Sequence, residues 1–153
     1  MDEAGARNIA ATVRALWHSV HDQMREQVRG ADHNTLNWKP LPLANSISVL
    51  IVHSLGSERE VLRAVRSLAT ERDRSAEFKS DLSGEELLAM LDRADRELDE
   101  NAAAWTAADF TELRPRGQNT PLPGLEELLS SYGHAREHLA QMELTKQLYD
   151  SRT

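Results

Sequence analysis

The sequence contains no cysteine, which excludes a disulfide framework, a thiolate-ligated zinc site and a cysteine nucleophile. Any thiol chemistry would therefore need a thiol supplied by a substrate or a cofactor. The longest apolar run, ISVLIV, is far shorter than a membrane span, and the acidic start MDEAGARN is unlike a secretory signal peptide. From these absences we expect a cytoplasmic protein without a transmembrane helix.

Aromatic residues are also scarce, at 5% of the chain, and no cluster of basic residues occurs. The formal net charge is −7, and the arginines are interleaved with acidic residues. A protein that binds duplex nucleic acid needs a basic face, and so does one that docks on anionic lipid. We therefore expect neither nucleic acid nor membrane as a partner and favour a small-molecule substrate.

The residues that are present indicate a single helical domain covering residues 1–153. Hydrophobic residues make up 40% of the chain, which is enough for an ordinary core. Four segments repeat apolar residues at three- and four-residue steps, and none shows convincing strand alternation. The predicted helices lie near residues 5–29, 47–70, 83–104 and 122–149. Four amphipathic helices in one domain are most simply an all-α four-helix bundle.

Capping residues support these boundaries. Asn45 or Ser46 is a good N-cap for the second helix. Ser83 and Glu86 have the spacing of a capping box for the third helix. Thr120 is a candidate cap for the fourth helix.

The apolar pattern also predicts which side chains face the core. The second helix is apolar almost all round at its start, from Ile47 to Val52, so this part should be buried on several sides. Farther along the pattern, Leu68 of the second helix and Leu129 of the fourth are predicted to face inward.

Three histidines stand out against this pattern. His134 and His138 lie one turn apart on the fourth helix, with Gln141 on the same face. His53 lies in the middle of the apolar run of the second helix. Helix bundles build metal sites from side chains on facing helices. The alternative is a hydrogen-bonded core histidine on one helix and a solvated pair on the other.

The donor set favours particular ions. Three neutral imidazoles suit a divalent transition metal such as Zn, Ni or Fe and suit Mg or Ca poorly. Three protein ligands leave a position open, as in catalytic sites. His18 and His21 are interpreted as structural or solvated, and His33 as exposed. Glu60 returns to the face of His53 only after two turns, too far to share an ion.

Two stretches resemble the DinB-like (DNA-damage-inducible) family: LNWKPLPLANSISVLIVHSLGSERE and HAREHLAQ. The resemblance implies an up-down-down-up four-helix bundle, often dimeric, with metal ligands at His53, His134 and His138. Gln141 lies three residues past His138 and seven past His134, a spacing that predicts a contact with a metal-binding histidine or with the substrate. The alternative for Gln141 is a solvent-facing amide. Ala140 departs from the glycine that many members have before the glutamine. Related members are S-transferases and maleylpyruvate isomerases that use low-molecular-weight thiols.

Three functional hypotheses follow. The first is a metal-dependent enzyme that transfers a small-molecule thiol to an electrophile, with hydrolysis by activated water as its variant. The second is a non-catalytic metal-binding protein of stress physiology. The third is a helical interaction module in which the histidines are structural. A homodimer is expected from the resemblance and from the unusually apolar second helix.

Overall fold

The computed structural model describes residues 1–152, and helices dominate it. The long helices are α1 (Glu3–Val28), α3 (Ile47–Val65), α5 (Gly84–Ala104) and α7 (Gly124–Asp150). Between them lie the short helices α2 (His33–Asn37), α4 (Arg74–Glu77) and α6 (Ala107–Thr111). The strands β1 (Leu113–Arg114) and β2 (Leu122–Pro123) pair in an antiparallel hairpin. The predicted all-α class is confirmed.

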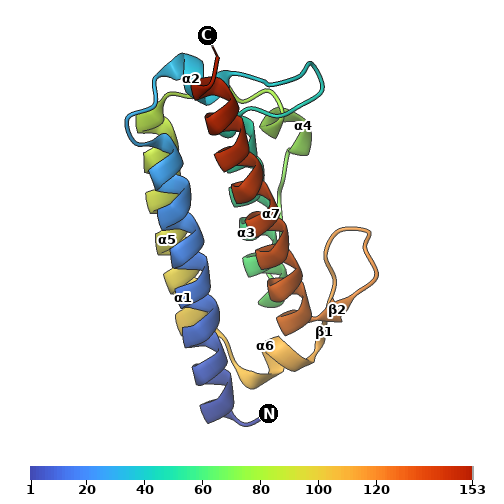
Figure 1. The fold of residues 1–153 in the computed structure, drawn as a ribbon. Coiled ribbons are helices and arrows are strands. Elements are labelled where there is room, and N and C mark those ends of the chain that lie inside the picture. Colours follow the sequence, from blue (N-terminus) through green and yellow to red (C-terminus); the bar gives the residue numbers. More distant parts are fainter. Residues whose placement is uncertain (153) are drawn as a thin grey trace.

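The four long helices lie side by side, with α1 and α7 ascending and α3 and α5 descending in Figure 1. Hydrogen bonds between helix ends show the same directions. The Ser48 hydroxyl, at the start of α3, lies 2.7 Å from that of Ser80, just before α5. Lys146, near the end of α7, donates to the carbonyl of Gln27 at the end of α1 over 3.4 Å. Helices α3 and α5 are therefore parallel, and so are α1 and α7.

The predicted caps of the second and third helices are confirmed. The Ser46 hydroxyl accepts from the Val49 backbone N–H, and Ser83 and Glu86 form the complete capping box. The cap predicted for the fourth helix at Thr120 is wrong, because α7 begins later, after Pro123. Residues before that point pair with β1, so the chain is still extended where the sequence predicted helix.

Helix α3 ends five residues earlier than predicted, at Val65. Ser67 adopts a left-handed conformation with φ 54°, and the Leu68 N–H donates to the Arg63 carbonyl. Such a closure is a common helix ending. Leu68 is consequently 39% exposed, so the inward position predicted for it is wrong. The connection from α3 to α5 contains α4 and crosses from one end of the bundle to the other (Figure 1).

The core lies between the four long helices and is covered within one chain. Ile47, Leu50 and Ile51 of α3 are each at most 1% exposed. The apolar start of α3 therefore needs no second copy of the chain to cover it. Leu129, predicted to be buried, is 50% exposed because α7 turns this position away from the core.

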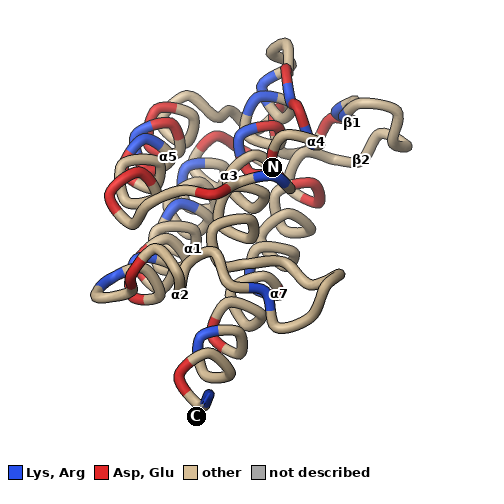
Figure 2. The backbone as a smooth tube through the Cα atoms, turned by 90° about the horizontal axis from the view of Figure 1, so that it is seen from above, with Lys and Arg blue, Asp and Glu red and all other residues tan. Residues whose placement is uncertain are grey.

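The surface carries both signs of charge. Acidic and basic positions are intermixed along α5 and around α3 and α4 in Figure 2. This mixture agrees with the absence of a basic cluster in the sequence. Among residues 1–152, none of the helices combines the length and the apolar content that crossing a membrane requires.

Candidate metal centre

Helices α3 and α7 pack against each other and bring the three histidines together. One ligating nitrogen from each of His53, His134 and His138 lies within 4.8 Å of the others. The Nε2 atoms of His134 and His138 are 3.0 Å apart. The imidazole of His53 has its ring centre 5.3 Å from that of His134 and 5.1 Å from that of His138.

A buried carboxylate orients His53. Its Nδ1 lies 2.8 Å from Oε2 of Glu77, and both side chains are less than a tenth exposed. A carboxylate only accepts hydrogen bonds, so the proton of the neutral ring is on Nδ1. The lone pair of His53 is therefore on Nε2. Histidine ligands of metals are commonly held by a carboxylate in this way.

An amide orients His138 in the corresponding way. Its Nδ1 lies 2.9 Å from Oε1 of Gln141, one turn farther along α7. Donation from Nδ1 to this oxygen leaves the Nε2 lone pair of His138 directed at His134. Gln141 is thus placed to position the His138 ring.

The donor set fits a divalent transition metal. Two imidazole nitrogens that each lie about 2.1 Å from one ion are separated by roughly 3 to 3.5 Å. The His134–His138 separation of 3.0 Å falls in that range. No carboxylate belongs to this three-histidine group, so the set suits Zn, Ni or Fe better than Mg or Ca. The grouping fits a metal-binding protein.

Burial keeps these rings available as ligands. Burial lowers the pKa of His53, and the Glu77 carboxylate offsets only part of the effect. The pKa of His134 falls to about 4, first because of burial and then because His138 and His53 lie close by. A metal ligand must be unprotonated, so both rings are in the competent state at neutral pH.

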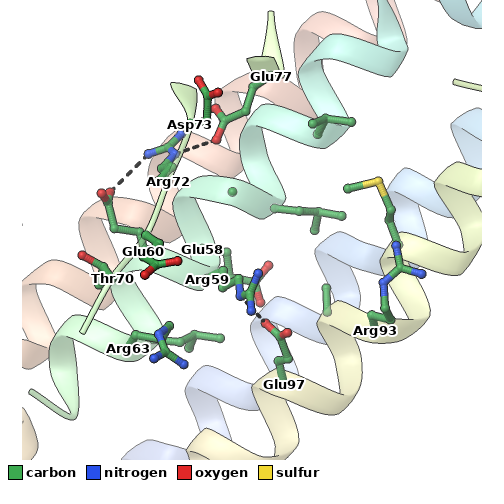
Figure 3. A pocket seen from close by; sticks show the side chains of 17 residues that line it. Glu58, Arg59, Glu60, Arg63, Thr70, Arg72, Asp73, Glu77, Arg93 and Glu97 are labelled. Carbon is green, nitrogen blue, oxygen red and sulfur yellow. Dashed lines mark hydrogen bonds and ion pairs between the residues drawn. The ribbon is translucent and has the colours of Figure 1, made fainter. Parts of the chain in front are cut away.

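An arginine fixes the carboxylate that holds His53. Arg72 donates from Nε to Oε1 of Glu77 over 2.7 Å and from Nη2 to Oε2 over 2.9 Å. Its Nη1 donates to Glu60 over 3.2 Å. Figure 3 shows Arg72 between the two glutamates, at the edge of a groove of about 330 Å³ between α3 and α5. The paired fork geometry holds Glu77 in one orientation.

Gly56 makes room for this arrangement. It lies on α3, three residues after His53, and a Cβ added there would stand 2.2 Å from Oε1 of Glu77 and 2.9 Å from its Cδ. The Glu77 carboxylate therefore lies directly against the backbone of α3. Only glycine permits that approach.

A second histidine cluster is structural. His21 is fully buried, with Nδ1 2.7 Å from Asp95 and Nε2 2.7 Å from Glu58. Burial disfavours its charge, but the two carboxylates prevail and raise its pKa to about 9. His18, Asp95 and His21 also offer ligand atoms within 4.8 Å of one another. However, a protonated His21 with both nitrogens bonded is a poor ligand.

The remaining acidic and histidine candidates lie outside the three-histidine group. His33 is exposed, as predicted, and its Nε2 pairs with Asp81 over 3.1 Å. Glu60 bonds to arginines and not to His53.

Sequence reasoning missed Glu77, Arg72 and Gly56. Glu77 lies between the predicted helices near residues 47–70 and 83–104, where the apolar pattern indicates no helix. The one-turn helix α4 begins where the Asp73 carboxylate accepts from the Ala76 N–H. An aspartate followed at that spacing by alanine and glutamate is the signal that could have revealed the helix.

Residues 10–142 of the chain match the DinB superfamily. No curated protein matches the chain. A DinB-like protein of Bacillus cereus has a similar structure, with a TM-score of 0.71, 15% identity and 86% of each chain covered. A conserved protein of Enterococcus faecalis gives a TM-score of 0.76 at 13% identity, covering 93% of this chain and 97% of the other.

These two structures share the fold at low identity, and the family match covers most of the sequence. The resemblance noted in the two sequence stretches is thereby confirmed. The chain belongs to the DinB superfamily.

Proposed function

We propose that this protein is a metal-dependent enzyme that transfers a small-molecule thiol to an electrophile. The observation that carries the proposal is the convergence of His53, His134 and His138, two of them oriented by a further side chain. A divalent transition metal in this set would lower the pKa of a nucleophile and polarise an electrophile. Three protein ligands leave room for such a reactant.

The residues of the chain would have separate roles in this reaction. His53, His134 and His138 would hold the ion, and Glu77 and Gln141 would fix two of the rings. Transfer forms a carbon–sulfur bond, releases the leaving group of the electrophile with its electron pair and frees the thiol proton to solvent. Because the chain has no cysteine, the sulfur must come from the substrate.

Two other functions use the same site. A hydrolase would employ water in place of the thiol, and the three-histidine set supports this equally well. A non-catalytic stress protein would bind the metal without turnover. The family resemblance favours the thiol.

A screen separates these possibilities. The protein loaded with Zn or Ni would be offered thiol–electrophile pairs and, separately, ester and amide substrates. Turnover with a thiol pair that disappears in His53→Ala and His134→Ala supports the proposal. Activity that survives loss of either histidine refutes a metal-centred reaction. If the protein binds metal tightly but turns over no substrate in either screen, the non-catalytic metal-binding function is favoured.

The proposal includes a homodimer, as the family resemblance suggests, and a cytoplasmic location. Sedimentation at micromolar concentration should give a species of twice the 17.2 kDa chain mass. A monomer under those conditions would remove the dimer from the proposal without affecting the metal site.

A further inference from the structure

A cavity of about 390 Å³ adjoins the three-histidine cluster, and His53 and His134 form part of its wall. Arginines dominate the rest of its charged lining. Arg72, Arg74 and Arg116 all line it, whereas Glu60 is the single acidic residue among the described residues that do so. The wall therefore carries three guanidinium groups next to the candidate metal centre.

Arg116 is held rigidly in this wall. It lies in the loop between β1 and β2, and its Nε donates to Glu60 over 3.0 Å. Its Nη2 donates to the Ser57 hydroxyl over 3.0 Å and its Nη1 to Glu127 over 3.3 Å. A guanidinium has five N–H donors, so one N–H on each terminal nitrogen remains for a ligand. A side chain already fixed in place loses little freedom when a ligand binds.

The other two arginines differ in how far they are neutralised. Arg72 bonds to Glu77 and Glu60 with all three of its nitrogens. The Arg74 side chain is exposed on α4 and forms no hydrogen bond or ion pair within residues 1–152. The carboxylates of Glu60, Glu77 and Glu127 neutralise the charges of Arg72 and Arg116. Arg74 adds a guanidinium charge that no carboxylate contacts within residues 1–152.

A buried hydroxyl in the same wall has no partner. Ser131 is 3% exposed, and its Oγ forms no hydrogen bond within the described part of the chain. It lies on α7, one turn before His134, and lines the cavity. Leaving a buried hydroxyl unpaired is costly unless a ligand or solvent pairs with it. This atom is a second, independent sign of a binding site.

We infer that this cavity binds the oxyanion group, a carboxylate or a phosphate, of the small molecule that reacts at the three-histidine centre. Arg116 and Arg74 supply the charge-assisted donors, and Ser131 supplies a neutral hydrogen bond. Guanidinium forks suit both oxyanions. The inference rests on the proposed function for the reactive end of the molecule and on the cavity itself for the anionic end.

The test uses Co(II)-loaded protein, whose visible absorption changes when a thiol sulfur reaches the cobalt. Mercaptosuccinate carries the anionic groups, and β-mercaptoethanol is the neutral probe. In Arg116→Gln, the affinity for mercaptosuccinate should fall about tenfold, and that for β-mercaptoethanol should stay the same. Arg74→Gln should produce a smaller loss in the same direction. Equal affinities for mercaptosuccinate in the wild type and both variants would overturn the inference.

Arg114→Gln is the matched control. Arg114 belongs to the same hairpin and forms ion pairs with Asp109 and Glu112, but it does not line the cavity. This variant should bind mercaptosuccinate as the wild type does. Because the Arg74 side chain has no hydrogen-bond or ion-pair partner within residues 1–152, Arg74→Gln should fold normally. It therefore tests the inference even if Arg116→Gln does not fold.

A second arm separates this inference from the proposed thiol chemistry. Succinate and inorganic phosphate would be titrated calorimetrically into metal-free protein. If neither thiol changes the cobalt spectrum, the thiol proposal fails, but anion binding that weakens in Arg116→Gln still supports the cavity. The tighter of the two anions identifies the group as carboxylate or phosphate. Absence of binding by both, or binding that neither arginine variant weakens, would refute the oxyanion site.

Discussion

The substitution Gly56→Ala tests whether Glu77 positions His53 for metal binding. The added Cβ would stand 2.2 Å from Oε1 of Glu77, and ordinary contact needs about 3.5 Å. The carboxylate must therefore retreat by roughly 1 Å. The hydrogen bond from Nδ1 of His53, 2.8 Å long, would then exceed hydrogen-bonding distance. We expect metal affinity to fall about 10- to 100-fold, as when such a partner is lost.

The effect on stability has a definite sign. Alanine in place of glycine inside a helix ordinarily stabilises by about 0.5–1 kcal/mol. Here we expect net destabilisation of about 1–2 kcal/mol, because the buried hydrogen bonds of Glu77 are disturbed. Urea unfolding of the metal-free protein and calorimetric titration with zinc measure the two effects separately.

Gly133→Ala provides the control. Gly133 lies on α7, and a Cβ there would have nothing within 4 Å. It should stabilise the protein by about 0.5–1 kcal/mol and leave zinc affinity unchanged. If Gly56→Ala behaved like Gly133→Ala in both measurements, the positioning role of Glu77 would be refuted.

Three further predictions concern protonation and the orienting side chains. The pKa of His21 is raised to about 9, so the protonated ring stabilises the folded protein by up to about 3 kcal/mol. This contribution to the free energy of unfolding should be complete below pH about 6.5 and lost as the pH rises to about 9. A flat profile in urea unfolding across that window would contradict the buried ion pair. Because the pKa of His134 is lowered to about 4, its ring in the metal-free protein should stay unprotonated as the pH falls below about 6.5, the ordinary histidine value. An NMR titration midpoint of this ring near that pH would oppose its availability as a ligand. Finally, Gln141→Leu should weaken zinc binding about threefold, and Glu77→Gln should weaken it about tenfold or more. The Gln141 effect is smaller because Gln141 is exposed. A larger loss in Gln141→Leu than in Glu77→Gln would refute this ranking.

Helix periodicity explains why the histidines could be singled out from the sequence. A spacing of four places His134 and His138 on one face, and the apolar run around His53 indicates a buried position. These are properties of single helices. Whether His53 lies level with the pair depends on how α3 and α7 pack, and the structure brings all three within reach of one another.

The residues that support the site could not be predicted in the same way. Glu77 and Arg72 lie in the connection before α5, where no periodic pattern applies. Their position depends on how that connection crosses α3 at Gly56. Arg116 likewise depends on the loop between β1 and β2. Such contacts join segments distant in sequence and follow from the tertiary fold alone.

The end of α3 shows a different limit. The apolar spacing continues to Leu68, so the pattern alone predicts a longer helix. Ser67 instead adopts a left-handed conformation, and its hydroxyl accepts a hydrogen bond from Arg114 over 2.7 Å. The end of α3 is thus accompanied by a contact between Ser67 and the β1–β2 hairpin. Serine is not a residue that marks a helix end in the sequence, so the pattern could not predict this ending.

The central claim is that His53, His134 and His138 bind one divalent transition metal ion per chain. Calorimetric titration of the metal-free protein with zinc and with nickel tests it most directly. The wild type and His33→Ala should each bind one equivalent, and binding should fall sharply in His53→Ala, His134→Ala and His138→Ala. No uptake by the wild type, or equal binding in all variants, would contradict the account.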